Sequence, residues 1–137
     1  MDLSHVIVSP MRRCLQTAYY LLKDHPNFRT TIKFVMSPLC REHLHTAGDV
    51  PSPHSVSAAY AKSLFPTIDT KSHFTGYTDK EFYFLEDLDK ELNDEINQAP
   101  DVSVIEKVFT VQKRYLPECM ESKSSKLTRA IKFKEVI

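Results

Sequence analysis

The sequence predicts one α/β domain over residues 1–137, a small sheet with packed helices. Val6, Ile7 and Val8 form a contiguous β-branched run, which is typical of a buried strand. Ile32, Phe34 and Met36 recur at every second position, which is the period of a strand. Helical patterns follow both runs, and this order of elements favours α/β layer packing.

The elements of the N-terminal half follow from proline, capping and periodicity signals. Ser9-Pro10 and Ser52-Pro53 each place a capping residue and a proline where a helix begins. His25-Pro26 and Pro66 end those helices, because a residue before proline is pushed out of helical geometry. We therefore expect strands over 5–9 and 31–36, helices over 9–25 and 52–66, and a polar loop over 37–52.

The C-terminal half reads mainly as helical. Thr78 to Glu81 and Ser103 to Glu106 match capping boxes, and apolar stripes at helical spacing follow both. Pro117 should kink or shorten the second of these helices. The expected elements are helices over 78–96 and 103–119, a linker over 122–125 and a last strand over 130–137.

Composition excludes several classes of function. The 18 basic and 18 acidic residues balance, which gives no reason to expect nucleic acid or an anionic membrane as a partner. No apolar run approaches a membrane span and no signal-peptide pattern is present. Three widely spaced cysteines favour a reducing, intracellular compartment, with cytoplasm and organelle left open. Two glycines argue against phosphate-binding glycine loops, and we expect no cofactor.

The richest motif lies at the start of the first helix. Arg12 and Arg13 fall on its first turn, where free backbone N–H groups and the helix dipole attract anions. The guanidinium of Arg13 suits phosphate oxygens, while Arg12 points about 100° away and is expected in solvent. Ser9 is a helix cap rather than a nucleophile, because no activating base lies near it in sequence. We predict a phosphate-binding corner at Arg13, with Ser9 beside it.

The string Ser-Pro-x-x-Arg-x-x-Gln-Thr, residues 9–17, resembles the second signature of the histidine phosphatase superfamily, the phosphoglycerate-mutase-like proteins. A second segment, 39–45 followed by 49–52, is similar to the family in order and spacing. The resemblance covers roughly the first 55 residues. It implies a partial phosphoglycerate-mutase-like fold, phosphatase or phosphomutase chemistry, Arg13 on the phosphate-binding arginine and Glu42 on the proton-donor position.

The chain departs from that family at both catalytic histidines. None of its six histidines lies in an Arg-His-Gly motif, and Met1 stands only a few residues before the first strand. Gly48 and Gly76 follow Ala47 and Thr75, so the second histidine motif is missing as well. We therefore expect a shortened, non-catalytic relative, a pseudoenzyme that binds phosphate or a phosphorylated small molecule. The alternative is a part of an active phosphohydrolase or mutase whose nucleophile-bearing segments lie outside this chain.

A third interpretation is a structural subunit. In the family the missing strand lies beside the strand at 5–9, so its loss should open a sheet edge. We expect either that residues 130–137 rebuild the sheet, or that the edge associates with a second copy or another protein.

The remaining polar residues each have a simpler explanation. Glu42 can be a loop carboxylate paired with Arg41 or Arg13, and an Asx turn explains Asp49 as well as the family does. The spacing Cys-x-x-His-x-His fits no zinc signature, so we predict no metal site among four neighbouring residues, Cys40, His43, His45 and His54.

Overall fold

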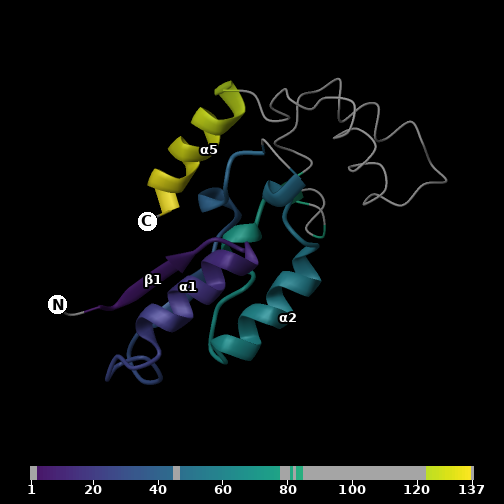
Figure 1. Cartoon of the computed structure of the whole chain (residues 1–137). Helices are drawn as coiled ribbons and strands as arrows, with labels where there is room; N and C mark the ends of the chain where they lie inside the picture. The colour runs from purple at the N-terminus through teal and green to yellow at the C-terminus, as the bar shows by residue number, and fades with distance from the viewer. Residues whose placement is uncertain (1–2, 45–46, 78–80, 82, 85–122, 137) are drawn as a thin grey trace.

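A computed structural model describes residues 3–44, 47–77, 81, 83–84 and 123–136 of the chain. The element order is a strand, a helix, a second strand, and then helices and short helical turns (Figure 1). The helices expected over 78–96 and 103–119 lie outside the described residues, apart from positions 81, 83 and 84. None of the helices in the described ranges combines the length and the apolar character needed to span a membrane.

Two parallel strands form the sheet. β1 (His5–Val8) pairs with β2 (Lys33–Met36) in a register that sets Val6 opposite Phe34 and Val8 opposite Met36. On the other side of β2, Asp69 forms a bridge: the Met36 amide donates to its carbonyl at 2.8 Å, and its own amide donates to Phe34 at 2.9 Å. The strands expected from the β-branched run and the alternation are confirmed, and so is the general α/β class.

The first helix, α1 (Arg12–Leu22), connects the strands but does not begin as expected. Met11 precedes it without a side-chain cap, and the Ser9 hydroxyl instead accepts the Met11 amide at 3.4 Å. Ser9 and Pro10 are both buried, so the hydroxyl turns inward and closes the bend between β1 and α1. The expectation that Ser9 caps the helix is wrong for this geometric reason.

The second helix, α2 (His54–Leu64), receives its N-terminal cap from a distant residue. Pro53 precedes it and no local side chain caps it. The backbone carbonyl of Glu81 accepts the His54 amide at 2.8 Å, and its carboxylate accepts both the amide at 3.2 Å and the hydroxyl of Ser55. A negative charge at a helix N-terminus is favourable, so Glu81 replaces the cap expected from Ser52.

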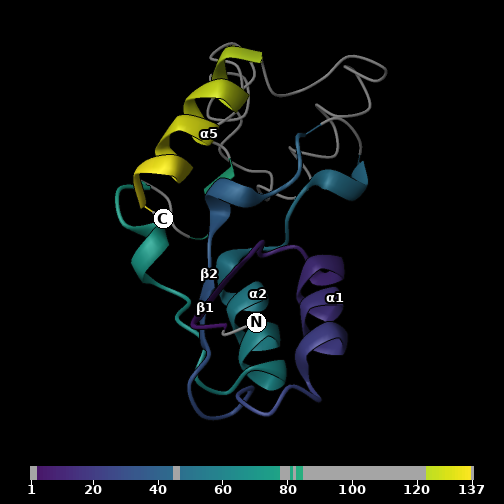
Figure 2. The same ribbon diagram turned by 90° about the vertical axis from the view of Figure 1, so that its left-hand side faces the viewer.

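An apolar core lies between the sheet and these two helices. Figure 2 shows α1 and α2 on one side of the strands and the C-terminal helix on the other. The rings of Phe34 and Phe65 have centroids 4.5 Å apart, and Tyr19 meets Phe65 edge to face at 6.0 Å. The alternating side chains of 32–36 are buried as their spacing predicted. The buried cluster also contains Val8, Leu15, Phe28, Leu44, Ala61, Ile68, Phe74, Tyr83 and Phe84.

The C-terminal segment is a helix, α5 (Lys123–Val136), where a linker over 122–125 and a strand over 130–137 were expected. Four of its fourteen residues are lysines, and Lys, Leu127, Arg129, Ala130 and Glu135 all favour a helix over a strand. Leu127 and Ile131 fall four positions apart, at helical spacing. The proposal that residues 130–137 rebuild the sheet is therefore wrong.

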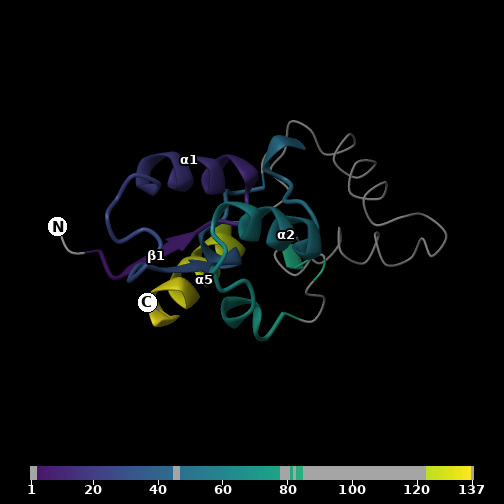
Figure 3. The ribbon, with the colours of Figure 1, turned by 90° about the horizontal axis from the view of Figure 1, so that it is seen from below.

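α5 lies against the 3-10 turn η1 (Pro38–Cys40), which follows β2. Viewed from below, α5 passes the strands on the side away from α1 (Figure 3). Arg129 is buried, and its Nη1 donates to the carbonyls of Leu39 at 3.0 Å and Arg41 at 2.8 Å. One guanidinium thus joins the last helix to the turn that leaves the sheet.

Candidate functional site

The candidate site is the corner where α1 begins, close to the 3-10 turn η2 (Ala47–Asp49) (Figure 2). A shallow cavity of about 360 Å³ lies there. The first turn of α1 contains no acidic residue, so nothing in it opposes an anion. The cavity is lined by Met11, Arg12, Arg13, Gln16, Gly48, Val50 and Ser52.

Arg13 reaches across the corner to η2. Its Nη1 donates to the Gly48 carbonyl at 2.8 Å, and its Nη2 lies 3.2 Å from Oδ1 of Asp49. The Arg13 side chain is 51% exposed and that of Asp49 16%. Arg13 therefore ties the loop to the helix and still presents part of its guanidinium to solvent, while Asp49 offsets some of its charge.

Arg12 stacks on a ring instead of extending into water. Its guanidinium carbon lies 4.6 Å from the ring centroid of Tyr60 on α2. The residue is exposed, as its angle on the helix predicted, but its guanidinium has a partner. A cation over an aromatic face is attracted by the ring quadrupole, so Arg12 joins α1 to α2 beside the cavity.

The other sequence-predicted site residues lie apart from Arg13. Ser9 is buried and its hydroxyl is occupied by the Met11 amide, so it does not line the cavity. Glu42 is exposed, and its carboxylate accepts the amide of the adjacent His43 at 3.0 Å. The structure brings Arg13 together with Asp49, and not with Ser9 or Glu42.

Cys40 and His54, two of the residues considered for a metal site, have other contacts, while His45 lies outside the described residues. The Cys40 thiol donates to the Ser37 carbonyl at 3.3 Å, and burial raises its pKa to about 11. The His54 ring Nε2 lies 2.7 Å from the Thr70 carbonyl. Within the described ranges, no three His, Cys, Asp or Glu side chains are placed to hold a metal ion. Cys14 and Cys40 are free thiols.

Sequence reasoning missed three partners at this end of the molecule. Asp49 pairs with an arginine 36 positions earlier, Tyr60 receives Arg12, and Glu81 caps α2. Each contact joins residues far apart in the chain, so no local spacing indicates it. Comparison with protein-family models, with curated proteins and with solved structures finds no match to this chain.

Proposed function

We propose that this chain is a histidine-phosphatase-like protein that binds inorganic phosphate or a phosphorylated small molecule weakly at the Arg13 corner, without covalent phosphohistidine chemistry. One observation carries the proposal: the half-exposed guanidinium of Arg13 lies at the start of an eleven-residue helix, beside a cavity. Arginine forks and helix N-termini both favour phosphate oxygens. The resemblance of residues 9–17 to the family signature supports the same position.

The ion pair with Asp49 should keep the affinity low. A phosphate must share the Arg13 guanidinium with a carboxylate that is already 3.2 Å away. A surface ion pair contributes about 0–1 kcal/mol. A phosphate dianion can therefore compete with Asp49 for Arg13, but breaking the ion pair reduces its binding free energy. We expect dissociation constants on the order of millimolar, which correspond to about 4 kcal/mol of binding free energy.

Binding without turnover follows from the residues around the corner. Phosphoryl transfer through this family's chemistry needs an imidazole nucleophile, and no described side chain that lines the cavity is a histidine. Glu42, at the family's proton-donor position, faces the backbone of its own loop. A positively charged corner can orient an anion but supplies no group to accept its phosphoryl.

The test is a phosphate titration of the isotope-labelled chain, followed through backbone amide shifts. We expect saturable shifts at Arg12, Arg13 and Gly48, lost in Arg13→Ala and unchanged in the control Arg29→Ala. Asp49→Asn should tighten binding severalfold, because it removes the competing carboxylate and keeps a similar shape. Equal affinities in the wild type, Arg13→Ala and Asp49→Asn would overturn the proposal.

Activity gives a separate measurement. Purified chain should not hydrolyse an aryl phosphate or small phosphorylated metabolites above a blank. Turnover that survives purification and disappears in Arg13→Ala would contradict the non-catalytic assignment and favour the alternative of an active phosphohydrolase.

We also propose that the edge of β1 away from β2 is an interaction surface. Within the described residues, β2 is the one strand that pairs with β1. A two-stranded sheet is marginal by itself, and an open strand edge is a template for pairing with another chain.

A further inference from the structure

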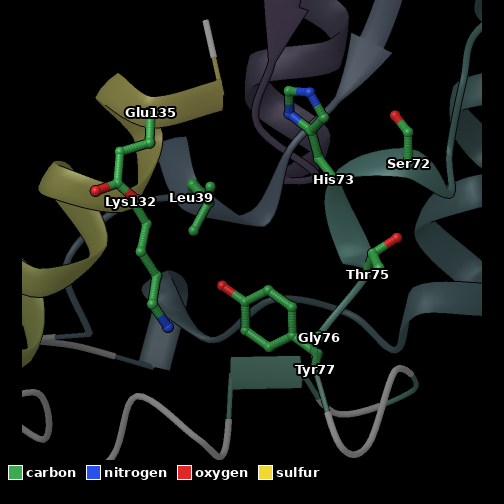
Figure 4. A pocket seen from close by; sticks show the side chains of 8 residues that line it. All are labelled: Leu39, Ser72, His73, Thr75, Gly76, Tyr77, Lys132 and Glu135. Atoms are coloured by element: carbon green, nitrogen blue, oxygen red, sulfur yellow. The ribbon is translucent and has the colours of Figure 1, made fainter.

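We propose that a second cavity, between α5 and the turn η3 (Ser72–Phe74), binds a small organic carboxylate with an apolar body. It lies away from the Arg13 corner and shares no lining residue with it. Its volume of about 410 Å³ suits a ligand of a few to a dozen heavy atoms. Figure 4 shows its wall, which is formed by Leu39, Ser72, His73, Thr75, Gly76, Tyr77, Lys132 and Glu135.

The two oppositely charged residues of the lining, Lys132 and Glu135, both come from α5. Figure 4 shows the Lys132 side chain extending from α5 on the side to which the Tyr77 hydroxyl points, while the Glu135 carboxylate turns away from Tyr77. The ammonium of Lys132 is a charged donor that suits a carboxylate oxygen. Leu39 and the Tyr77 ring supply an apolar surface in the same cavity.

Buried positive charge behind the wall favours an anion as well. Arg129 is 6% exposed and donates to the carbonyl of Leu39, which lines the cavity. Arg41 is 4% exposed and lies in the same segment. Charges inside a low-dielectric wall are screened less than charges in water, so their field extends into the cavity.

Gly76 leaves room on the opposite side. Its φ of +93° favours glycine, and a Cβ built there would meet no atom within 4 Å. Gly76 lines the cavity, and the space beside its Cα is open. An organic monocarboxylate with an apolar body satisfies both requirements, charge and apolar surface.

The experiment is a titration of the full chain with benzoate, followed by backbone amide shifts, with benzamide as the uncharged probe of equal shape. We expect saturable shifts at Leu39, Gly76, Tyr77 and Lys132, with benzamide binding at least about tenfold more weakly. Shifts confined to Arg12 and Arg13 would overturn this proposal and leave the phosphate proposal intact.

Charge variants of α5 sharpen the test, because removing the positive and the negative charge should change the benzoate affinity in opposite directions. Lys132→Gln should weaken benzoate binding severalfold, Lys132→Arg should restore most of it, and Glu135→Gln should strengthen it. Lys134→Gln is the matched control, since Lys134 is exposed on the same helix and does not line the cavity. These residues are exposed or at the rim, so the fold should survive each change. Equal affinity in Lys132→Gln and Lys134→Gln, or equal binding of benzoate and benzamide, would overturn the proposal.

Discussion

The N-terminal part of the molecule and the C-terminal helix are held in place by different kinds of contact. Between β1 and α2, long apolar side chains such as Leu15, Met36 and Phe65 are at most 1% exposed. On α5 the large apolar residues Leu127 and Ile131 are 62% and 50% exposed. There Arg129 donates two hydrogen bonds to backbone carbonyls of the chain after β2.

This difference has consequences for stability. Burial of apolar area is non-directional and spread over many side chains, so the N-terminal part should unfold as one unit. The large apolar residues Leu127 and Ile131 of α5 are mostly exposed, and segments with little apolar burial open locally before the rest of a protein. The two cavities also belong to different regions. The Arg13 corner lies in the N-terminal part, whereas the second cavity is lined in part by α5.

The largest expected effect is on the core. Phe65→Ala removes a ring that packs against Tyr19, Phe28 and Phe34, and it should lower the free energy of unfolding by about 3–5 kcal/mol. Urea denaturation followed by circular dichroism measures it. The control Leu21→Ala changes a residue that is 76% exposed and should cost much less. Similar losses in the two variants would contradict the core described above.

A smaller and more local effect is expected at α5. Arg129→Ala removes the hydrogen bonds to the Leu39 and Arg41 carbonyls, which costs about 1–3 kcal/mol. We expect faster proteolysis within α5 and little change in the unfolding midpoint of the core. Lys126→Ala, at an exposed position of the same helix, is the control. A midpoint that falls as far as in Phe65→Ala would mean that the two regions unfold together.

The smallest effect concerns β1. If its open edge pairs with another chain, light scattering should show a concentration-dependent dimer, and the amides of Val6 to Val8 should exchange more slowly as the concentration rises. The exchange rates within α1 serve as the internal reference. A stable monomer whose Val6 to Val8 amides exchange rapidly at all concentrations would contradict the proposed interaction surface.

Local sequence patterns predicted the N-terminal strands and helices well. They failed where contacts between distant residues determine the local structure. The strands at 5–8 and 33–36 follow from β-branched and alternating residues, and α1 and α2 end close to the prolines that predicted their limits. Ser9 failed as a cap because its burial turns the hydroxyl toward Met11. Residues 130–136 form a helix where a strand was expected, because a short apolar pattern fits both periods and the helix formers of this segment decide between them.

The sequence predicts the cation of the candidate site, Arg13, but it does not predict the residues that contact this cation. Arg13 stands where its motif places it, since a residue on the first turn of a helix needs only local geometry. Its pairing with Asp49 depends on the path of the loop over 37–52, which no periodicity describes. The same loop keeps Glu42 away from the cavity lining.

The attachment of α5 through Arg129 also bears on the order in which the chain assembles. The contact between Arg13 and Gly48 closes a loop of 35 residues, whereas the contact between Arg129 and Leu39 closes one of 90. Closing the longer loop costs about 1 kcal/mol more in chain entropy, and little apolar burial offsets it. At a synthesis rate of about 5–20 residues per second, the segment up to residue 77 is made about 3–10 s before Arg129. The sheet and its two helices therefore have time to form first, and docking of the last helix becomes the late kinetic step that completes the second cavity.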